Sequence, residues 1–426
     1  MKKRISMTAI ALLAGVSTGW AADNADLEKQ VLELARQNRM LLERVVELER
    51  IVAGQEPPAK GLAEKTNIHE EKESVEKRLR QIEAALDGKL ESESGDVEKN
   101  LARRINDHVE LSGLVEVEVN SSENFAGEES SDINLATVEL GIDATISDWS
   151  QAHVVLLHEE GEEDEHVTVD EALITVGNTE EFPAYLTAGR MYLPFGSYVT
   201  NMVSDTLPHE IGETGDSGVL TGFQVSGFYG SLYAFNGDIR EQGEDDRIDA
   251  WGASLGYAHE GEQFSLDAAL DWLNSIGDSD GLGDYLQDNT GNEETDEYVQ
   301  GFAAHLLLQY GPFDVVAEYV RALDAFTTAE IAFNGSGAEP RAWSLEAGWT
   351  FDLLTRQTIF SLSWQGTDEA LALGLPEDRY MAAVRMFLLS NTSVALEYLH
   401  DEDYDLAAGG TGDDGDSATM QVAVEF

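Results

Sequence analysis

The sequence predicts an all-β transmembrane barrel of about 16 antiparallel strands, preceded by an N-terminal α-helical coiled coil. Three observations lead to this prediction. The chain begins like a secreted protein, most of its length alternates apolar and polar residues, and its last residue is Phe426. A soluble β-sandwich shows the same alternation, but it does not explain the three features together. A final strand that ends in an aromatic residue is typical of outer-membrane barrels.

Residues 1–21 have the layout of a secretory signal peptide. Residues 1–4 are Met-Lys-Lys-Arg, an apolar run follows from Ile5 to Val16, and Gly19 and Ala21 supply small side chains before a cleavage site. The apolar run is shorter than the roughly 20 residues of a membrane-spanning helix. We therefore expect export, cleavage after Ala21 and a final location in the outer membrane of a Gram-negative bacterium, with the N-terminal arm in the periplasm.

The chain contains no cysteine. Disulfides, cysteine-based zinc sites and thiol catalysis are therefore excluded. No later segment is long and apolar enough for a membrane helix, so a membrane-spanning form has to be a closed barrel. The histidines are scattered, and no Ser–His–Asp order or nucleophile elbow occurs. We accordingly expect no enzyme and no tightly held cofactor.

Charge divides the chain near residue 107. Residues 1–107 carry 18 Lys and Arg against 20 Asp and Glu, whereas residues 108–426 carry 8 Arg, no Lys and 62 Asp and Glu. The second part therefore has a formal charge of −54 and the whole chain −56. Such a surface repels phosphate backbones, so we expect no nucleic-acid partner.

Residues 22–53 are predicted to form a coiled coil. Apolar residues recur at alternating spacings of four and three, with Leu at the d positions, Val at the a positions and Asn38 at one a position. The register is carried by Leu27, Val31, Leu34, Asn38, Leu41, Val45, Leu48 and Val52. Asn38 is expected to fix register and oligomer state. These core residues favour a dimer, and a trimer stays open as the other homo-oligomer.

Residues 54–107 are predicted to be a linker with a second helical segment. Pro57 and Pro58, within the stretch from Gly54 to Gly61, end the first helix. An apolar face then recurs between about His69 and Ile105. This region would be a periplasmic spacer, and the alternative is a flexible charged linker.

From residue 108 the apolar period changes to two, and residues 108–426 are predicted to form the barrel. The predicted strands are 108–119, 133–146, 150–159, 166–177, 183–192, 218–227, 229–236, 247–259, 262–274, 297–310, 312–323, 341–351, 355–364, 379–389, 392–401 and 417–426. The even number is the one that single-chain barrels prefer. The longer connections are predicted at 120–132, 193–217, 275–296, 324–340 and 402–416, and a barrel of this size is wide enough for a water channel.

The polar face of these strands is acidic. The carboxylates expected to point into the lumen are Glu116, Glu118, Glu139, Asp143, Glu171, Asp267, Asp271, Glu318, Glu346 and Glu397, and the expected inward bases are Arg190 and Arg385. Rings of carboxylates favour the passage of cations. The alternative is that these side chains simply solvate a wide lumen.

The loops are more acidic still. Clusters such as Glu162, Glu163 and Asp164, or Asp413, Asp414 and Asp416, contain the oxygen ligands that Ca²⁺ prefers. None has the spacing of an EF-hand. We therefore expect at most loosely bound Ca²⁺ or Mg²⁺.

The connection 193–217 is a candidate constriction loop. Pro194 cannot donate to a strand ladder and Gly196 permits a tight reversal, so the chain is able to turn into the lumen there. The candidate residues are Pro194, Phe195, Gly196, Ser204, Asp205, Glu210 and Glu213. The alternative is an ordinary surface loop.

A longer motif surrounds this loop: Gly189-Arg190, Pro194-Phe195-Gly196, Thr200-Asn201-Met202, Ser204-Asp205, His209-Glu210 and Gly212-Glu213-Thr214. With it the chain resembles the siderophore porin family typified by the LbtU protein of Legionella. The resemblance implies a signal peptide, an N-terminal coiled coil, a sixteen-strand barrel without a plug domain, and uptake of a ferric siderophore by facilitated diffusion. Outer-membrane lipid, lipopolysaccharide and further copies of the chain would be the partners.

Two other functions stay open at this point. A general porin that prefers cations would use the same acidic lumen. A structural outer-membrane protein would use the coiled coil to space the membrane from the cell wall.

Overall fold

The computed structural model describes residues 103–106, 108–160, 166–243, 247–261, 263–291 and 293–426. The expected signal peptide (1–21), coiled coil (22–53) and most of the second helical segment lie outside the described residues. The described part of the chain begins with a short strand, β1 (Arg103–Asn106), which pairs with β2.

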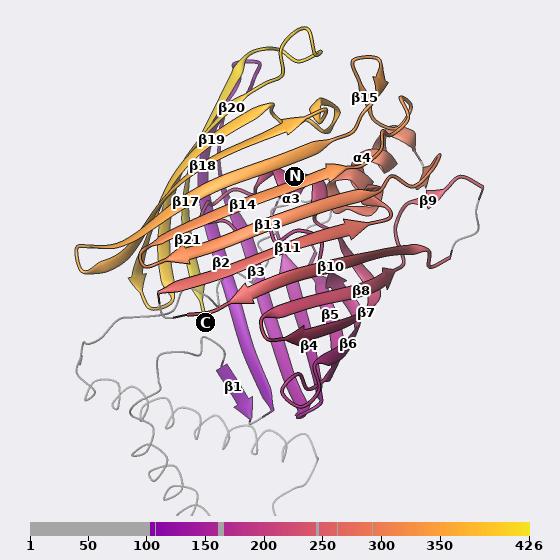
Figure 1. The fold of residues 1–426 in the computed structure, drawn as a ribbon. Coiled ribbons are helices and arrows are strands. Elements are labelled where there is room, and N and C mark those ends of the chain that lie inside the picture. The colour runs from indigo at the N-terminus through magenta and orange to yellow at the C-terminus, as the bar shows by residue number, and fades with distance from the viewer. Residues whose placement is uncertain (1–102, 107, 161–165, 244–246, 262, 292) are drawn as a thin grey trace, which may run out of the picture. The chain divides into compact units, whose positions relative to one another are not determined.

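Sixteen long strands form one antiparallel sheet that closes on itself (Figure 1). Each strand pairs with the next along the chain, and the last pairs with the first, with Val119 opposite Met420 and Val115 opposite Val424. The strands are β2 (Val109–Glu123), β3 (Glu129–Ser147), β4 (Ser150–His158), β5 (Thr168–Gly177), β6 (Ala184–Tyr192), β7 (Gly215–Val225), β8 (Phe228–Phe235), β10 (Ala250–His259), β11 (Phe264–Leu273), β13 (Gly301–Tyr310), β14 (Phe313–Ala322), β17 (Arg341–Leu353), β18 (Arg356–Asp368), β19 (Asp378–Leu389), β20 (Thr392–Glu402) and β21 (Asp414–Glu425). The predicted sixteen-strand antiparallel barrel is confirmed.

The largest difference from the sequence prediction is the length of β2 and β3. β2 continues to Glu123 and β3 begins at Glu129, so the connection between them is residues 124–128 instead of the predicted 120–132. Ser122 pairs with Ser130 in this extension. The residues of the extension are polar on both faces of the sheet. The sequence therefore shows no alternation of apolar and polar residues there, and the prediction ended the strands too early.

The two ends of the barrel differ. One, the turn end, has short connections, such as those at 148–149, 226–227 and 311–312, and Phe426 lies there with its backbone bonded to Gly113. The other, the loop end, has the connections 124–128, 159–167, 193–214, 236–249, 274–300, 323–340, 369–377 and 403–413. Most of the irregular structure therefore gathers at one mouth of the barrel.

The outer face of the wall is apolar and carries aromatic rings towards both ends. Near the loop end, Trp251 contacts Trp272 and Trp343 contacts Trp364, with ring centroids 4.6 and 4.5 Å apart. Exposed rings near the turn end include Phe264, Tyr310, Phe313 and Trp349. Two belts of rings flanking an apolar band are typical of a wall that faces a membrane.

The loop end contains short helices: α3 (Leu207–Gly212), α4 (Asp280–Thr290), and the 3₁₀ turns η2 (Ile276–Asp278) and η3 (Leu371–Leu373). Thr206 caps α3 by accepting from the N–H of His209, and Gly291, in the left-handed conformation, ends α4. Two parallel residue pairs join β9 (Arg240–Glu241) to β12 (Glu294–Thr295), and β15 (Ala332–Phe333) forms a hairpin with β16 (Ser336–Gly337). Among the described residues, no helix has the length and apolar character to cross a membrane.

A hydrophobic core lies inside the barrel at the loop end. Leu207 and Ile211 of α3 pack with Leu282 and Leu286 of α4, and all four side chains are fully buried. Inner-face residues of the surrounding strands complete the cluster, including Met191, Leu220, Phe235, Leu273, Val320 and Ala342. Two connections, 193–214 and 274–300, thus fold inward and pack on each other.

Candidate functional site in the lumen

The connection between β6 and β7, residues 193–214, is here called the inward segment. Phe195 has no exposed surface, and the carbonyl of Pro194 accepts a hydrogen bond of 3.2 Å from the Tyr233 hydroxyl. Gly196 has φ +84°, and a Cβ there would lie 2.4 Å from the ring of Tyr198. Only glycine fits this reversal, which sends the chain along the inner wall instead of outward.

Four inward-pointing side chains, the wall carboxylates, bind the inward segment: Asp271 on β11, Glu318 on β14, Glu346 on β17 and Glu397 on β20. Asp271 accepts from the N–H of Gly196 at 3.0 Å. Glu318 accepts from the N–H groups of Ser197 and Tyr198 at 2.6 and 2.9 Å.

The other two wall carboxylates bind the middle of the segment. Glu346 accepts from the Thr200 hydroxyl at 2.6 Å and from the Asn201 N–H at 2.9 Å. Glu397 accepts from the Val203 N–H at 2.5 Å and from the Ser204 hydroxyl at 2.6 Å. On β18, the neutral Gln365 accepts from the Leu207 N–H at 2.8 Å.

This arrangement satisfies backbone donors that have no strand partner. A buried N–H without an acceptor is costly, and a hydrogen bond to a carboxylate is about twice as strong as one between neutral groups. All four wall carboxylates are buried, with 2–5 % of their surface exposed. They therefore hold the segment against the wall instead of presenting free charge to the lumen.

Two arginines bind the same segment through its carbonyl groups. Arg385 on β19 donates to the Met202 carbonyl, and Arg379 donates to the Asp205 carbonyl, both at 3.4 Å. Arg379 also forms an ion pair with Asp401 at 2.8 Å. Carboxylates of the wall thus accept from the N–H groups of the segment, and arginines of the wall donate to its carbonyl groups.

The segment ends in α3, whose charged residues are also buried. Nε2 of His209 lies 3.0 Å from Oε1 of Glu213, one helical turn later. Burial alone would lower the pKa of His209, but the carboxylates of Glu213 and Asp205 outweigh it and raise this pKa to about 10. His209 is therefore an imidazolium at neutral pH.

The helix α3 is fixed from its other side by the connection 274–300. The Ser279 hydroxyl donates to the Ile211 carbonyl at 2.6 Å. A Cβ on Gly281 would lie 2.0 Å from the Glu210 carbonyl oxygen, so the two helices approach as closely as a glycine allows. The candidate residues of the constriction loop thus belong to one packed unit.

The remaining predicted lumen carboxylates lie elsewhere on the inner face of the barrel. They are Glu116 and Glu118 on β2, Glu139 and Asp143 on β3, Glu171 on β5 and Asp267 on β11. His153 contacts Asp143 at 2.7 Å and Glu171 at 3.5 Å, and Asp267 accepts from the Tyr229 hydroxyl at 2.6 Å. Glu118 accepts from Gln421 of β21 at 3.1 Å, so at least four of these six carboxylates are bonded to groups on the strands themselves.

The prediction for Arg190 was wrong. Met191, its neighbour on β6, packs into the hydrophobic core inside the barrel, so Arg190 lies on the outer face. There it pairs with Ser217 of β7 and donates to the Asp170 carbonyl at 3.2 Å. Near the loop end the inside of the barrel is apolar, which inverts the rule that polar residues point inward.

Several residues that hold the segment were missed by the sequence reasoning. Thr200, Asn201 and Gln365 provide hydrogen bonds, and His209 provides the buried charge. Thr200-Asn201 lies in the motif that carries the family resemblance, and this was the available signal. No sequence signal marked Gln365, because it is one of many polar residues in the alternating pattern of a strand.

The weak metal candidates fall in two places. Glu162, Glu163 and Asp164 lie outside the described residues. Asp416 accepts from the Tyr398 hydroxyl at 2.6 Å and from His400 at 2.9 Å. Over the described ranges, no three acidic or histidine side chains are grouped to hold a metal ion.

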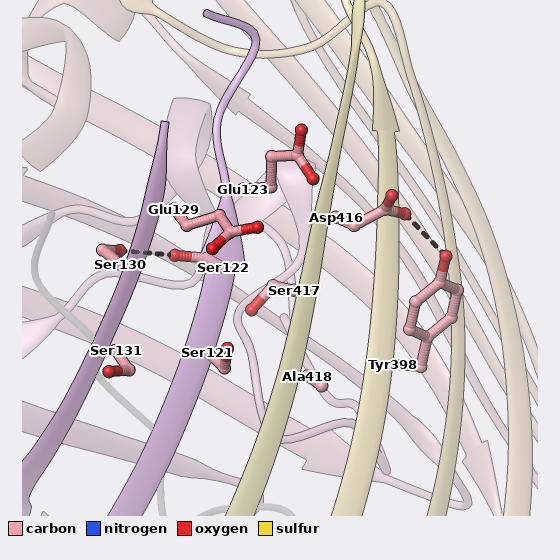
Figure 2. A pocket seen from close by; sticks show the side chains of 10 residues that line it. All are labelled: Ser121, Ser122, Glu123, Glu129, Ser130, Ser131, Tyr398, Asp416, Ser417 and Ala418. Atoms are coloured by element: carbon pink, nitrogen blue, oxygen red, sulfur yellow. Dashed lines mark hydrogen bonds between the residues drawn. The ribbon is translucent and has the colours of Figure 1, made fainter. Parts of the chain in front are cut away.

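A shallow depression of about 420 Å³ lies on the loop-end rim, across β2, β3, β20 and β21 (Figure 2). Glu123 stands opposite Glu129 on one side and Asp416 on the other, and serines of β2 and β3 lie below them. Ser122 and Ser130 share a hydrogen bond of 2.9 Å. The depression is open, polar and distinct from the inward segment.

Comparison with known proteins supports the fold. No family model matches the chain. A UPF0422 protein of Coxiella burnetii is 27 % identical over 310 residues, covering 71 % of this chain and 66 % of that protein. A UPF0422 protein of Legionella pneumophila (strain Paris) is 28 % identical over 334 residues, covering 69 % and 62 %. The chain thus spans less than two thirds of the length of these relatives.

Solved structures of outer-membrane channels share the architecture. Pseudomonas putida OprB superposes with a TM-score of 0.54 at 8 % identity, covering 75 % of this chain and 94 % of that one. Salmonella typhi OmpF gives 0.53 at 15 %, covering 76 % and 100 %, and an anion-selective porin of Comamonas acidovorans gives 0.53 at 11 %, covering 75 % and 99 %. At these identities the likeness establishes the porin-type barrel fold alone.

Proposed function

We propose that this chain is an outer-membrane porin that admits a ferric siderophore, or a solute of similar size, by facilitated diffusion. The observation that carries the proposal is the inward segment. A segment held along the inner wall by four carboxylates narrows a wide barrel at a defined place. In this role the loop end faces the outside of the cell, as long loops do in such barrels.

The restriction supports a channel with a size limit. Phe195, Leu207 and Ile211 are fully buried in the core that joins the segment to α4. The packed unit thus fills part of the mouth with apolar side chains. In this proposal the solute passes along the inner faces of β3 and β5, where Glu139, Asp143 and Glu171 lie.

Charge bears on the solute. A polycarboxylate chelate would be repelled by a barrel with a formal charge of −54, whereas a neutral chelate would escape this repulsion and a cationic chelate would be attracted. We therefore propose that the preferred siderophore lacks free carboxylates when iron is bound.

A general cation-preferring porin is the second candidate. The carboxylates on β2, β3 and β5 favour it, because clustered negative charge in a lumen concentrates cations. It shares the restriction but has no preferred chelate. The two candidates differ in whether one solute blocks the current at a saturable site.

The experiment is single-channel conductance of the purified protein in a planar bilayer, with and without ferric siderophores. Saturable block by one uncharged or cationic chelate supports the siderophore porin. An open, cation-selective current without block supports the general porin. Folded protein that gives no current contradicts both porin functions and favours a structural role in the outer membrane.

The role of the inward segment has its own variant. Deleting residues 198–213 removes the part bound to Glu346 and Glu397, and conductance should rise. The matched control is a deletion within the connection 403–413, which lies at the same end of the barrel. Unchanged conductance after the first deletion would show that the inward segment does not restrict the channel.

A further inference from the structure

Tyrosines on two strands, β6 and β8, point into the barrel. Tyr185 alternates with Leu186, which is 47 % exposed on the outer face, and Tyr229 alternates with Phe228, which is 54 % exposed there. Tyr233, further along β8, lies on the same inner face and packs in the hydrophobic core. Tyr185 and Tyr229 are only partly buried, so they offer ring surface to the lumen.

Each of these two rings lies over a glycine of the neighbouring strand. A Cβ on Gly222 of β7 would lie 2.3 Å from Cζ of Tyr185, and a Cβ on Gly256 of β10 would lie 2.2 Å from Cζ of Tyr229. An inner-face Cβ projects from the wall into the lumen. A ring that occupies its place therefore lies along the wall, with one face on the backbone and the other towards the lumen.

Small residues surround the two rings. Gly222 pairs with Ser231 of β8, and Ser231 pairs with Ser254 of β10. Glycine inside a strand weakens it and often marks a place where another group approaches the backbone closely. The surface formed by Tyr185, Tyr229, Gly222, Ser231, Ser254 and Gly256 is here called the tyrosine wall.

A carboxylate fixes one ring of the tyrosine wall and lies beside it. The Tyr229 hydroxyl donates to Asp267 of β11 at 2.6 Å, and Nε2 of His305 lies 3.7 Å from the same oxygen of Asp267. The Asp267 side chain is 34 % exposed, so it is also accessible to donors of a solute. Sites for small molecules combine aromatic surface with a few placed polar groups, and the tyrosine wall with Asp267 has both.

We propose that the tyrosine wall binds the transported solute through a flat ring that carries hydroxyl groups and no negative charge. The inference deepens the proposed function and rests on it, because it concerns the solute that the porin admits. The face of a tyrosine ring is negative and attracts the positive C–H groups of another ring. Asp267 accepts from hydroxyl groups and repels anions. A sugar ring and a phenol ring share this chemistry.

The tyrosine wall lies next to the restriction. Tyr233, on the loop-end side of Tyr229, donates to the Pro194 carbonyl where the inward segment begins. The wall extends from there towards the turn end. A solute that enters at the loop end would therefore meet the rings after the inward segment. Stacking there would retain ring-bearing solutes beside the restriction, and other solutes of the same size would pass without this help.

The test is saturation-transfer NMR with two uncharged probes, maltotriose for the sugar ring and catechol for the phenol ring. The full chain is used, folded in detergent, and empty micelles give the background. The Tyr185→Leu, Tyr229→Leu double variant removes both ring faces and keeps apolar side chains. Tyr310→Leu is the matched control, because that ring is 64 % exposed on the outer face near the same end of the barrel. Heat-dependent mobility in gels establishes that each barrel is folded.

We expect transfer to the ring protons of at least one probe. It should be several-fold lower in the double variant and unchanged in Tyr310→Leu. Transfer to maltotriose assigns a sugar ring to the solute, and transfer to catechol alone assigns a phenol ring. Transfer to neither probe, or equal transfer in the double variant, would overturn the proposal. If the double variant does not fold, each single variant should lower the transfer at least two-fold.

A ring over a glycine also covers the backbone, and this structural role has to be separated from binding. The Tyr185→Phe, Tyr229→Phe variant keeps both ring faces and removes both hydroxyls. We expect it to retain most of the transfer. Loss of transfer from this variant, in a folded barrel, would show that the ring faces are not what binds the probe.

None of these measurements needs a current. A protein that binds a ring at the tyrosine wall but does not conduct would contradict the proposed transport and leave the stacking site standing. A channel that conducts but binds neither probe would do the reverse.

Discussion

His209 shows how one buried base on α3 stabilises the inward segment. Its pKa of about 10 lies above the ordinary 6.5, so its stabilising charge is fully present below pH 6.5 and is lost as pH rises through about 10. His209→Leu leaves Glu213 buried without its partner, which costs about 3–5 kcal/mol. We expect chymotrypsin to cleave this variant after Phe195 or Tyr198 at neutral pH, and the unaltered protein only at alkaline pH.

The control for this prediction is His166→Leu, because His166 is exposed in the connection before β5. Its cleavage pattern should match that of the unaltered protein. If His209→Leu resists chymotrypsin as well as the control does, the ion pair is not what holds α3.

Asp278 presents the opposite case, a buried acid that is costly when charged. Its Oδ1 accepts from the N–H groups of Asp238 and Ile239 at 2.9 and 2.8 Å. Burial raises the pKa of Asp278 to about 6, even though these hydrogen bonds lower it. Because the folded pKa exceeds the ordinary 3.8, stability falls as pH rises from about 4 to 6, by on the order of 3 kcal/mol.

Asp278→Asn keeps the acceptor and removes the charge. We expect slower hydrogen exchange at Asp238 and Ile239 at pH 7, and loss of the pH dependence between 4 and 6. Asp288→Asn, at an exposed position of α4, is the matched control and should change neither. Faster exchange in Asp278→Asn would mean that the charge itself stabilises this turn.

At the scale of elements, the wall carboxylates are predicted to determine how firmly the inward segment lies against the barrel. Each hydrogen bond to a charged group contributes about 1.5–3 kcal/mol. Glu346→Ala with Glu397→Ala removes the acceptors for residues 200–204. We expect a conductance between those of the unaltered protein and the 198–213 deletion, and cleavage of the segment by chymotrypsin.

Glu139→Ala with Asp143→Ala is the control, since it also removes two inner-face carboxylates but none that bonds to the segment. It should lower cation selectivity and leave the segment protected. Equal conductance changes in both pairs would show that lumen charge, and not the position of the segment, limits the current.

The sequence predicts the strands well, because an alternation of period two follows directly from the pleat of a two-sided wall. It also predicts which carboxylates point inward, although it places the base Arg190 on the wrong face. It does not predict their use. Glu397 binds Val203 across 194 residues and Asp271 binds Gly196 across 75, and no local pattern marks such contacts. The error at Arg190 has the same origin, since the core that reverses the local polarity is assembled from distant segments.

For the whole molecule, the dominant property is a formal charge of −56. Such a charge destabilises the folded chain by self-repulsion, which salt screens. The rim carboxylate of Glu123 lies directly opposite Glu129 on one side and Asp416 on the other, where like charges are unfavourable. Because of this repulsion, we expect divalent cations to bridge the surface carboxylates loosely.

This view predicts a small effect of chelation. Removal of Ca²⁺ and Mg²⁺ at constant ionic strength should lower Tm by less than about 4 °C, since a loss of about 1 kcal/mol shifts Tm by about 2–4 °C in a domain of roughly 150–250 residues and by less in a larger one. Raising the concentration of NaCl should recover most of the loss, because screening by monovalent ions replaces bridging. A much larger drop that only Ca²⁺ reverses would contradict loose bridging and establish a specific site among the acidic loops. Calorimetry of the folded barrel in detergent, with and without chelator, separates the two outcomes.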